Sequence, residues 1–243
     1  LAAVLSASIA ACSSDPVDPA PPHPMRFSRS AGVIPGDPDA PYVVNLLFLA
    51  EPENPIWTTT PHVTTATGSV NVEGAALVQG SETPHGILGN LQVTVRAKQP
   101  GLLQSVTVSA PGGPSVDVAI GHWEVVQPRP QLDFMSPEYP VSAPGCDIVA
   151  DADPIRVSLK APGSAPPTVQ SLTPGVTLSA TADTDVLTVS MSCTDEWDVY
   201  AVQPEVVVDG SRRWLPQILI GMMGIDDSLV RKIASRPAVR YPA

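Results

Sequence analysis

The sequence has little of what usually identifies an enzyme or a nucleic-acid-binding protein. It contains no Gly-x-Ser-x-Gly elbow, Ser-x-x-Lys, His-Glu-x-x-His, P-loop or dinucleotide-binding motif. Basic residues are scarce, with 13 lysines and arginines against 24 acidic residues and a net charge of −11. An acidic chain of this kind is a poor partner for nucleic acid. We therefore expect no catalytic residues, no cofactor and no nucleic-acid partner.

Aromatic residues make up only 5% of the chain, whereas Val, Thr, Ser, Ala, Pro and Gly dominate. This composition favours short strands and turns over long helices. The segment 42–50 is almost continuously apolar, which predicts a strand buried on both faces. Other short, mostly alternating segments follow, divided by Gly and Pro, at 69–78, 91–97, 106–109, 116–120, 123–126, 146–149, 155–159, 176–180, 187–193, 197–202 and 205–208.

Strands at this spacing predict an all-β fold: one or two antiparallel, immunoglobulin-like β-sandwich units with a short C-terminal helix. The Pro-rich segment 127–130 is the expected boundary between unit 1 (42–127) and unit 2 (131–210). Whether the two units share a core stays open. The last segment, 211–243, begins apolar and continues into a predicted basic helix at 226–235, with Asp226 or Asp227 as its N-cap.

The N-terminal segment 1–11 is apolar and rich in small residues, and it ends at Cys12. Ile9-Ala10-Ala11-Cys12 followed by Ser13 and Ser14 resembles the lipobox of a bacterial lipoprotein signal peptide. The resemblance implies that 1–11 is a signal-peptide remnant and that Cys12 carries lipid. It also implies that the protein is extracytoplasmic and is anchored to the cell membrane by this lipid. The apolar run is too short to span a bilayer, which takes about 20 residues. The Pro-rich remainder of 12–41 is expected to be an extended tether.

Two cysteines remain once Cys12 is assigned to lipid, and the expected compartment is oxidising. Cys146 shares its strand face with Ile148, and Cys193 shares its face with Val189. Both sulfurs should therefore point toward the core. We predict a Cys146–Cys193 disulfide, with two buried thiols as the alternative. The resemblance of this unit to an immunoglobulin domain is loose, because Trp197 follows the second cysteine.

Acidic residues gather in predicted loops and are weak calcium candidates: Asp147, Asp151 and Asp153, then Asp183 and Asp185, then Asp195, Glu196 and Asp198. Aspartate is also an ordinary turn residue, and no EF-hand spacing is present, so no metal site is predicted. His62, His85 and His122 have no marked nucleophile beside them. Adjacent Met222 and Met223 are expected to be core residues in preference to copper ligands.

A membrane anchor, a stalk and a rigid β domain without a recognisable active site indicate a binding or interaction protein of the cell envelope. Its expected partner is an envelope protein, a glycan or a peptide. One alternative is a structural subunit of a transport, secretion or cell-wall assembly, and a weaker one is an envelope hydrolase. The basic tail 212–243 is expected either to be solvated or to lie on anionic lipid or an acidic partner.

Overall fold

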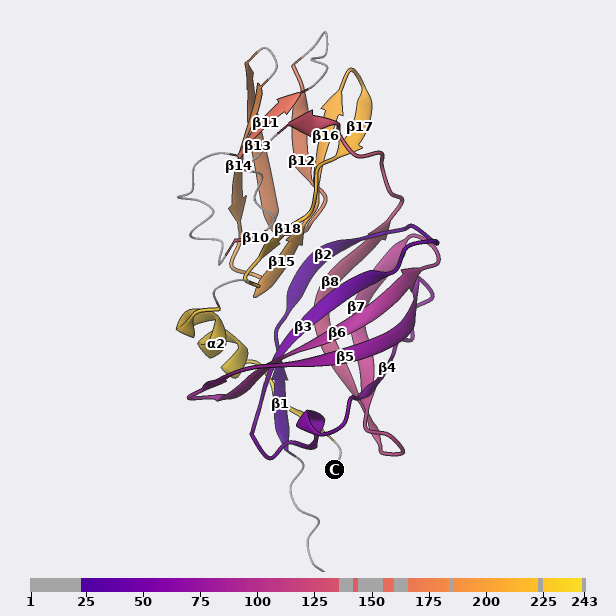
Figure 1. Ribbon diagram of the computed structural model, residues 1–243, viewed down its shortest axis with the longest axis vertical. Helices are drawn as coiled ribbons and strands as arrows, with labels where there is room; N and C mark the ends of the chain where they lie inside the picture. The colour runs from indigo at the N-terminus through magenta and orange to yellow at the C-terminus, as the bar shows by residue number, and fades with distance from the viewer. Residues whose placement is uncertain are drawn as a thin grey trace, which may run out of the picture.

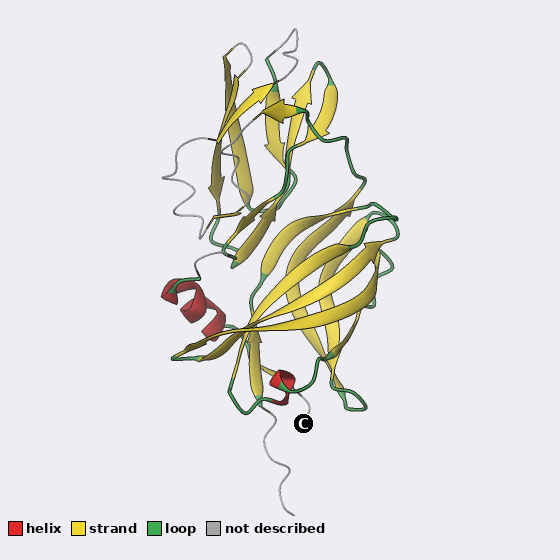
Figure 2. Cartoon of the chain, in the orientation of Figure 1, coloured by secondary structure: helices red, strands yellow, loops and turns green. Residues whose placement is uncertain are grey.

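The computed structural model describes residues 23–135, 142–143, 155–159, 166–183, 186–222 and 225–241. Within these ranges the chain is almost entirely β, with one α-helix, α2 (Asp227–Ala234), and one 3-10 turn, η1 (Pro55–Trp57). Figures 1 and 2 show two β bodies, one above the other, with α2 beside their junction. No helix in the described ranges is long and apolar enough to cross a membrane.

The lower body in Figure 1, here the first unit, is a sandwich of two sheets packed around one apolar core. Its front sheet has the order β19 (Val239–Arg240), β1 (Pro24–Phe27), β3 (Tyr42–Ala50), β6 (Gly86–Ala97) and β5 (Val70–Thr83). Its back sheet contains β2 (Ser30–Pro35), β8 (Ser115–Val126), β7 (Gly101–Ser109) and β4 (His62–Thr64). Alternate residues of these strands fill the space between the sheets.

The upper body, here the second unit, also has two sheets around its own core. One sheet has the order β13 (Val176–Asp183), β14 (Val186–Cys193), β11 (Ile155–Leu159) and β9 (Phe134–Met135). The other has the order β12 (Thr168–Ser171), β16 (Pro204–Val208) and β17 (Ser211–Trp214). The expected all-β sandwich architecture is therefore confirmed.

The two units are joined by one continuous sheet. The back sheet of the first unit continues past β2 into β15 (Val199–Val202), β18 (Ile218–Ile220) and β10 (Ser142–Ala143). Strand β2 runs parallel to both of its neighbours, β8 and β15. A Cβ atom on Gly32 in β2 would lie 2.4 Å from the Trp123 ring and 2.9 Å from the Ala201 Cβ, so only glycine permits this packing.

Strand β15 shows how closely the units are interleaved. Its neighbouring residues Val199, Tyr200 and Ala201 are all buried, yet each belongs to a different apolar cluster. Ala201 packs in the first unit, Tyr200 packs in the second, and Val199 packs with helix α2. The two units thus have separate core clusters held together by a shared sheet, which answers the question that the sequence left open.

Most predicted strands appear close to the expected positions. Strand β3 is buried on both faces as predicted: Leu46 and Phe48 face the sandwich core, whereas Leu47 and Leu49 pack against α2. The segments 116–120 and 123–126 form one strand, β8, which continues through Gly121 at φ +115°. The segment 146–149 lies outside the described residues.

The Pro-rich segment 12–41 is not a tether throughout its length. Residues 24–27 and 30–35 form β1 and β2, and Met25, Phe27 and Ile34 are fully part of the core. The prolines do not prevent this, because Pro24 begins β1 and Pro35 ends β2, where a missing N–H is tolerated. A tether can therefore extend only to about His23.

The expected segment 211–243 is also not a separate region. Residues 211–214 pair with β16 in the second unit, and 218–220 pair with β15 in the shared sheet. Residues 239–240 return to the first unit and pair with β1, so the two ends of the described chain lie together at the bottom of Figure 1. The chain thus crosses between the units more than once, and 127–130 is not their only connection.

Candidate functional site

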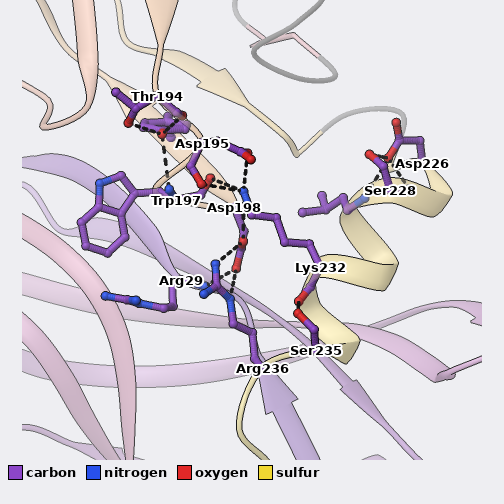
Figure 3. Close-up of polar contacts among 12 residues, drawn as sticks. Arg29, Thr194, Asp195, Trp197, Asp198, Asp226, Ser228, Lys232, Ser235 and Arg236 are labelled. Atoms are coloured by element: carbon purple, nitrogen blue, oxygen red, sulfur yellow. Dashed lines mark hydrogen bonds and ion pairs between the residues drawn. The ribbon is translucent and has the colours of Figure 1, made fainter.

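Polar residues gather where the second unit, the first unit and helix α2 meet (Figure 3). We call this group the Asp198 cluster; it consists of Arg29, Asp195, Trp197, Asp198, Lys232 and Arg236. Arg29 lies in the β1–β2 connection, Asp195, Trp197 and Asp198 precede β15, and the two basic residues lie in or just after α2. Segments from both ends and the middle of the sequence therefore meet at one point.

The carboxylate of Asp198 is fully buried and is satisfied from three directions. Arg236 donates to it through Nη2 at 2.7 Å and Nε at 3.1 Å, a two-pronged contact. The backbone N–H of Arg29 donates to Oδ2 at 2.7 Å, and Lys232 Nζ lies 3.6 Å from Oδ1. Asp198 therefore ties the C-terminal segment and the N-terminal connection to the start of β15.

The Arg29 guanidinium lies over the Trp197 ring, 4.9 Å from its centroid, in a cation–π contact. The loop that carries Trp197 is held by Tyr200, whose hydroxyl donates to the carbonyl of Thr194 and accepts from the backbone N–H of Trp197. His122 also contacts the Trp197 ring, with ring centroids 6.4 Å apart. The loop geometry thus depends on buried packing in both units.

Helix α2 presents its basic residues to this cluster because of its own sequence. Asp226 caps the helix by accepting from the backbone N–H groups of Ser228 and Leu229, and these bonds, with the Ser228 hydroxyl, lower the pKa of Asp226. Leu229, Val230 and Ile233 pack on the outer face of β3. The polar side of the last turn is then left facing the Asp198 cluster.

The Asp198 cluster is a structural junction, because its charged groups bind one another. Lys232 donates to Asp195 at 2.8 Å and, mainly through this hydrogen bond, lowers the pKa of Asp195. Arg212 similarly pairs with the buried Glu205 at 3.0 Å in the second unit. In the basic tail, Arg212, Lys232 and Arg236 thus bind carboxylates of the same chain. Whether the remaining basic residues of the tail are solvated or contact lipid or an acidic partner stays a prediction.

A cleft of about 400 Å³ lies between the units, and we call it the inter-unit cleft. It is walled by the end of β2, the start of β3, the 128–131 connection and the second unit. Its lining is rich in proline, aromatic rings and amide side chains: Pro35, Pro41, Tyr42, Pro128, Gln131, Gln203, Trp214 and Gln217, with Asp37, Ala40 and Arg129 completing it.

Tyr42 and Gln217 are fixed in place in the wall of this cleft. The Tyr42 hydroxyl donates to Gln217 Oε1 at 2.6 Å, and Gln217 Nε2 donates to the carbonyl of Val33 at 3.1 Å. Burial raises the pKa of Tyr42, and the hydrogen bond to Gln217 lowers it by less, so the phenol stays neutral. On their other side the same two residues line a smaller hollow of about 240 Å³, which also includes Trp123 and Met222.

Arg129, which lines the cleft, and Arg212 share one buried acidic partner, Glu205. Arg129 lies 3.7 Å from the buried carboxylate of Glu205, which also accepts from Gln170 at 2.7 Å. Trp214, opposite Glu205 on the next strand, is buried, and its Nε1 has no hydrogen-bond partner among the described residues. The cleft therefore offers amide donors and acceptors and apolar rings, together with one acidic and one basic side chain, Asp37 and Arg129.

The residues singled out from the sequence are not brought together at this cleft. Cys193 ends β14, half-buried against the second core, whereas Cys12 and Cys146 lie outside the described residues, so the disulfide stays a prediction. Of the calcium candidates, Asp183 lies at the exposed end of β13, and Asp195, Glu196 and Asp198 lie before β15, where Asp195 and Asp198 bind basic side chains. The others, Asp147, Asp151, Asp153 and Asp185, lie outside the described residues. The described ranges contain no group of three His, Cys, Asp or Glu residues placed to bind a metal ion.

The histidines and Met222 are likewise dispersed. His62 begins β4, His85 lies in the β5–β6 turn, and His122 lies in β8 beside Trp197. Met222 is partly buried against the apolar residues of helix α2 and β3, as expected of a core residue. The cleft residues Tyr42, Trp214 and Gln217 were missed because Tyr42 is far in the sequence from the other two, and no local motif marks a tyrosine or glutamine for binding.

No protein-family model matches the sequence, and no curated protein matches it either. Solved structures similar in fold include domains 5–6 of the S-layer protein SbsC (13% identity, TM-score 0.25, covering 80% of this chain and 94% of that one). Others are the tandem Ig repeats of Dlar (13%, 0.23, covering 82% and 97%) and the Yersinia pseudotuberculosis adhesin InvE (14%, 0.23, covering 81% and 58%). At these identities and TM-scores, we draw no functional conclusion from the similarity.

Proposed function

We propose that the chain is a binding protein of the bacterial cell envelope, held outside the membrane by lipid on Cys12, and that its inter-unit cleft binds a neutral glycan. The observation that carries this proposal is the cleft itself, with Tyr42, Trp214 and amide side chains in its walls. Sugar hydroxyls both donate and accept hydrogen bonds, as amides do, and the apolar face of a sugar ring packs on aromatic and proline rings.

We assign a neutral ligand because the charged side chains in the walls of the cleft balance one another. Asp37 and Arg129 line the cleft with opposite charges, and the phenol of Tyr42 stays protonated. With one charge of each sign, the walls have no net charge that attracts an anion or a cation, and a charged ligand would have to give up its hydration, which is unfavourable. A neutral glycan avoids this penalty.

The position of the chain ends supports presentation away from a membrane. His23 accepts a hydrogen bond from the backbone N–H of Tyr241 at 3.2 Å, at the end of the first unit farthest from the second unit (Figure 1). The stretch from Cys12 to His23 can reach at most roughly 36 Å when extended. With lipid on Cys12, the first unit lies near the bilayer and the second unit points outward.

The cleft is tested by filling it. The variant Gln131→Trp places a large ring in the cleft, and Gln127→Trp places the same ring at another exposed glutamine nearby that does not line it. In calorimetric titrations against a panel of neutral envelope oligosaccharides, we expect binding by the native chain and by Gln127→Trp and no binding by Gln131→Trp. Absence of binding by the native chain, or equal loss in both variants, would refute the glycan assignment.

The anchor is tested separately in a bacterial host by incorporation of a labelled fatty acid. Label should enter the native chain and the control variant Ser13→Ala and should be lost in Cys12→Ser. Membrane fractions should lose the Cys12→Ser protein in parallel. Label that persists in Cys12→Ser would rule out this attachment site.

A further inference from the structure

Strand β5 has an open edge. It is 14 residues long and forms the end of the five-stranded sheet, where β6 is its only hydrogen-bonded neighbour among the described strands. At its start, Ser69 accepts from the backbone N–H groups of Lys98 and Gln99, which holds the beginning of the strand against the rest of the sandwich. From Gly74 to Glu82 the side away from β6 has no backbone partner in the described part of the chain.

This edge lacks the usual protection against pairing with another strand. Soluble β proteins guard open edges with lysine, proline, very short strands or a covering segment. Residues 74–81 contain no charged residue and no proline, and they are mostly exposed. Val78 within them is 47% exposed, one of only two large apolar side chains so exposed in the described chain.

The edge is also regular over a defined length. Residues 74–79 pair one to one with β6, from Gly74 opposite Thr94 to Gln79 opposite Gly89. Irregularities in register flank this stretch on both sides, between Val72 and Gly74 and between Gln79 and Glu82. A straight stretch bounded by bulges can accept an added strand of about six residues.

The strand that pairs with the open edge of β5 could come from a second copy of the chain or from a different protein, and the charges near the edge favour a different protein. Two copies of β5 that pair antiparallel over the whole uncharged stretch 74–81 place Glu73 of one opposite Glu82 of the other, and like charges at opposed positions destabilise a sheet. Glu73 is already bound by Arg96 through both carboxylate oxygens, whereas Glu82 has no partner among the described residues. The net charge of −11 adds to the repulsion between copies.

We propose that β5 is a docking edge for β-strand addition, and that its occupant is an extended segment of another protein. The segment carries small or apolar side chains opposite residues 74–79 and a basic residue near Glu82. Backbone hydrogen bonds supply the affinity, and the basic residue supplies the orientation. This interaction is a separate one from that at the glycan cleft, because no residue of β5 or β6 lines the cleft.

The probe is a fluorescein-labelled synthetic peptide with the sequence of β6, GILGNLQVTVRA, which alternates as β5 requires and carries one arginine. A scrambled peptide of the same composition is its control. We expect saturable binding of the probe to the full chain by fluorescence anisotropy and no binding of the scrambled peptide. Hydrogen exchange of the complex should show new amide protection in residues 74–82.

Two exposed valines on the same outer face of the sheet give matched variants. Val78→Lys adds a charge at the edge, whereas Val43→Lys adds one at a similarly exposed position (42%) in β3, inside the sheet. The proposal predicts a Kd for the probe weakened about tenfold or more in Val78→Lys and unchanged in Val43→Lys. Equal affinity in all three proteins, or protection outside β5, overturns it. A dimer of the native chain by sedimentation that Val78→Lys abolishes also overturns it, in favour of self-pairing.

Discussion

Replacement of Asp198 by asparagine should strongly destabilise the whole protein. The side chain of Asp198 is 0% exposed, and it links the β1–β2 connection, the start of β15 and the segment after α2. Asparagine keeps the size of the side chain and one acceptor for the backbone N–H of Arg29. It removes the negative charge that faces Arg236 and Lys232.

The expected loss follows from the burial of the partners. Removal of one member of a buried ion pair destabilises a protein by about 3–5 kcal/mol, because the other charge is left buried and unpaired. The side chains of Arg236 and Lys232 are 21% and 28% exposed, so both can recover some contact with water. We therefore place the loss for Asp198→Asn at about 3 kcal/mol, a large fraction of a typical stability of about 5–15 kcal/mol.

Asp195 is the matched control, because it lies on the same loop and binds the same helix. Its side chain is 100% exposed, and its hydrogen bond with Lys232 at 2.8 Å is open to solvent and salt. Asp195→Asn should therefore lose less than about 1 kcal/mol, and less still at high salt. Urea unfolding followed by tryptophan fluorescence measures both variants. Equal losses in the two, or a loss below about 1 kcal/mol for Asp198→Asn, would refute the role of the cluster as a buried junction.

Three further predictions concern other parts of the chain. Asp226→Ala should remove the cap of helix α2 and lower the free energy of unfolding by about 1 kcal/mol, measured by urea unfolding, with faster hydrogen exchange confined to the helix. Because burial raises the pKa of Tyr42 above its ordinary 10.0, its contribution to stability is complete below pH 10 and is lost as pH rises beyond it; Tyr42→Phe should flatten this alkaline decline in a series of unfolding curves. Mass spectrometry of a non-reduced digest should find a peptide that joins Cys146 to Cys193, and alkylation of both thiols before reduction would disprove the bridge.

Local patterns in the sequence were sufficient for most elements. Alternation of apolar and polar residues predicts β6, and the continuous apolar run predicts that β3 is covered on both sides. The capping aspartate and apolar stripe of α2 predict both its start and its buried face. Each of these signals depends on neighbours within a few residues, and therefore each can be read from one short segment.

The same local reasoning failed for β1 and β2. Proline density predicts an extended tether, yet Pro24 and Pro35 lie at strand ends, and the apolar residues Met25, Phe27 and Ile34 between them are buried. The partners that bury them are remote: β2 pairs with β8 and with β15, whose residues lie about ninety and about one hundred and seventy positions along the chain. Periodicity carries no information about pairing at that range, so neither the shared sheet nor the cleft beside it could be predicted.

The interleaving of the units determines what kind of ligand the cleft can take. Both walls are attached to one sheet, because β2 ends at Pro35 on one side and its neighbour β15 leads to Gln203 on the other. The hydrogen bond from Gln217 to the Val33 carbonyl crosses between the same two units. A hinge motion that closed the cleft would have to break the parallel pairing of β2 with β15, and buried sheet pairing of this kind resists local opening. The cleft is therefore preformed with a fixed width, and the glycan binding that we propose for it would need no closure of the protein around the ligand.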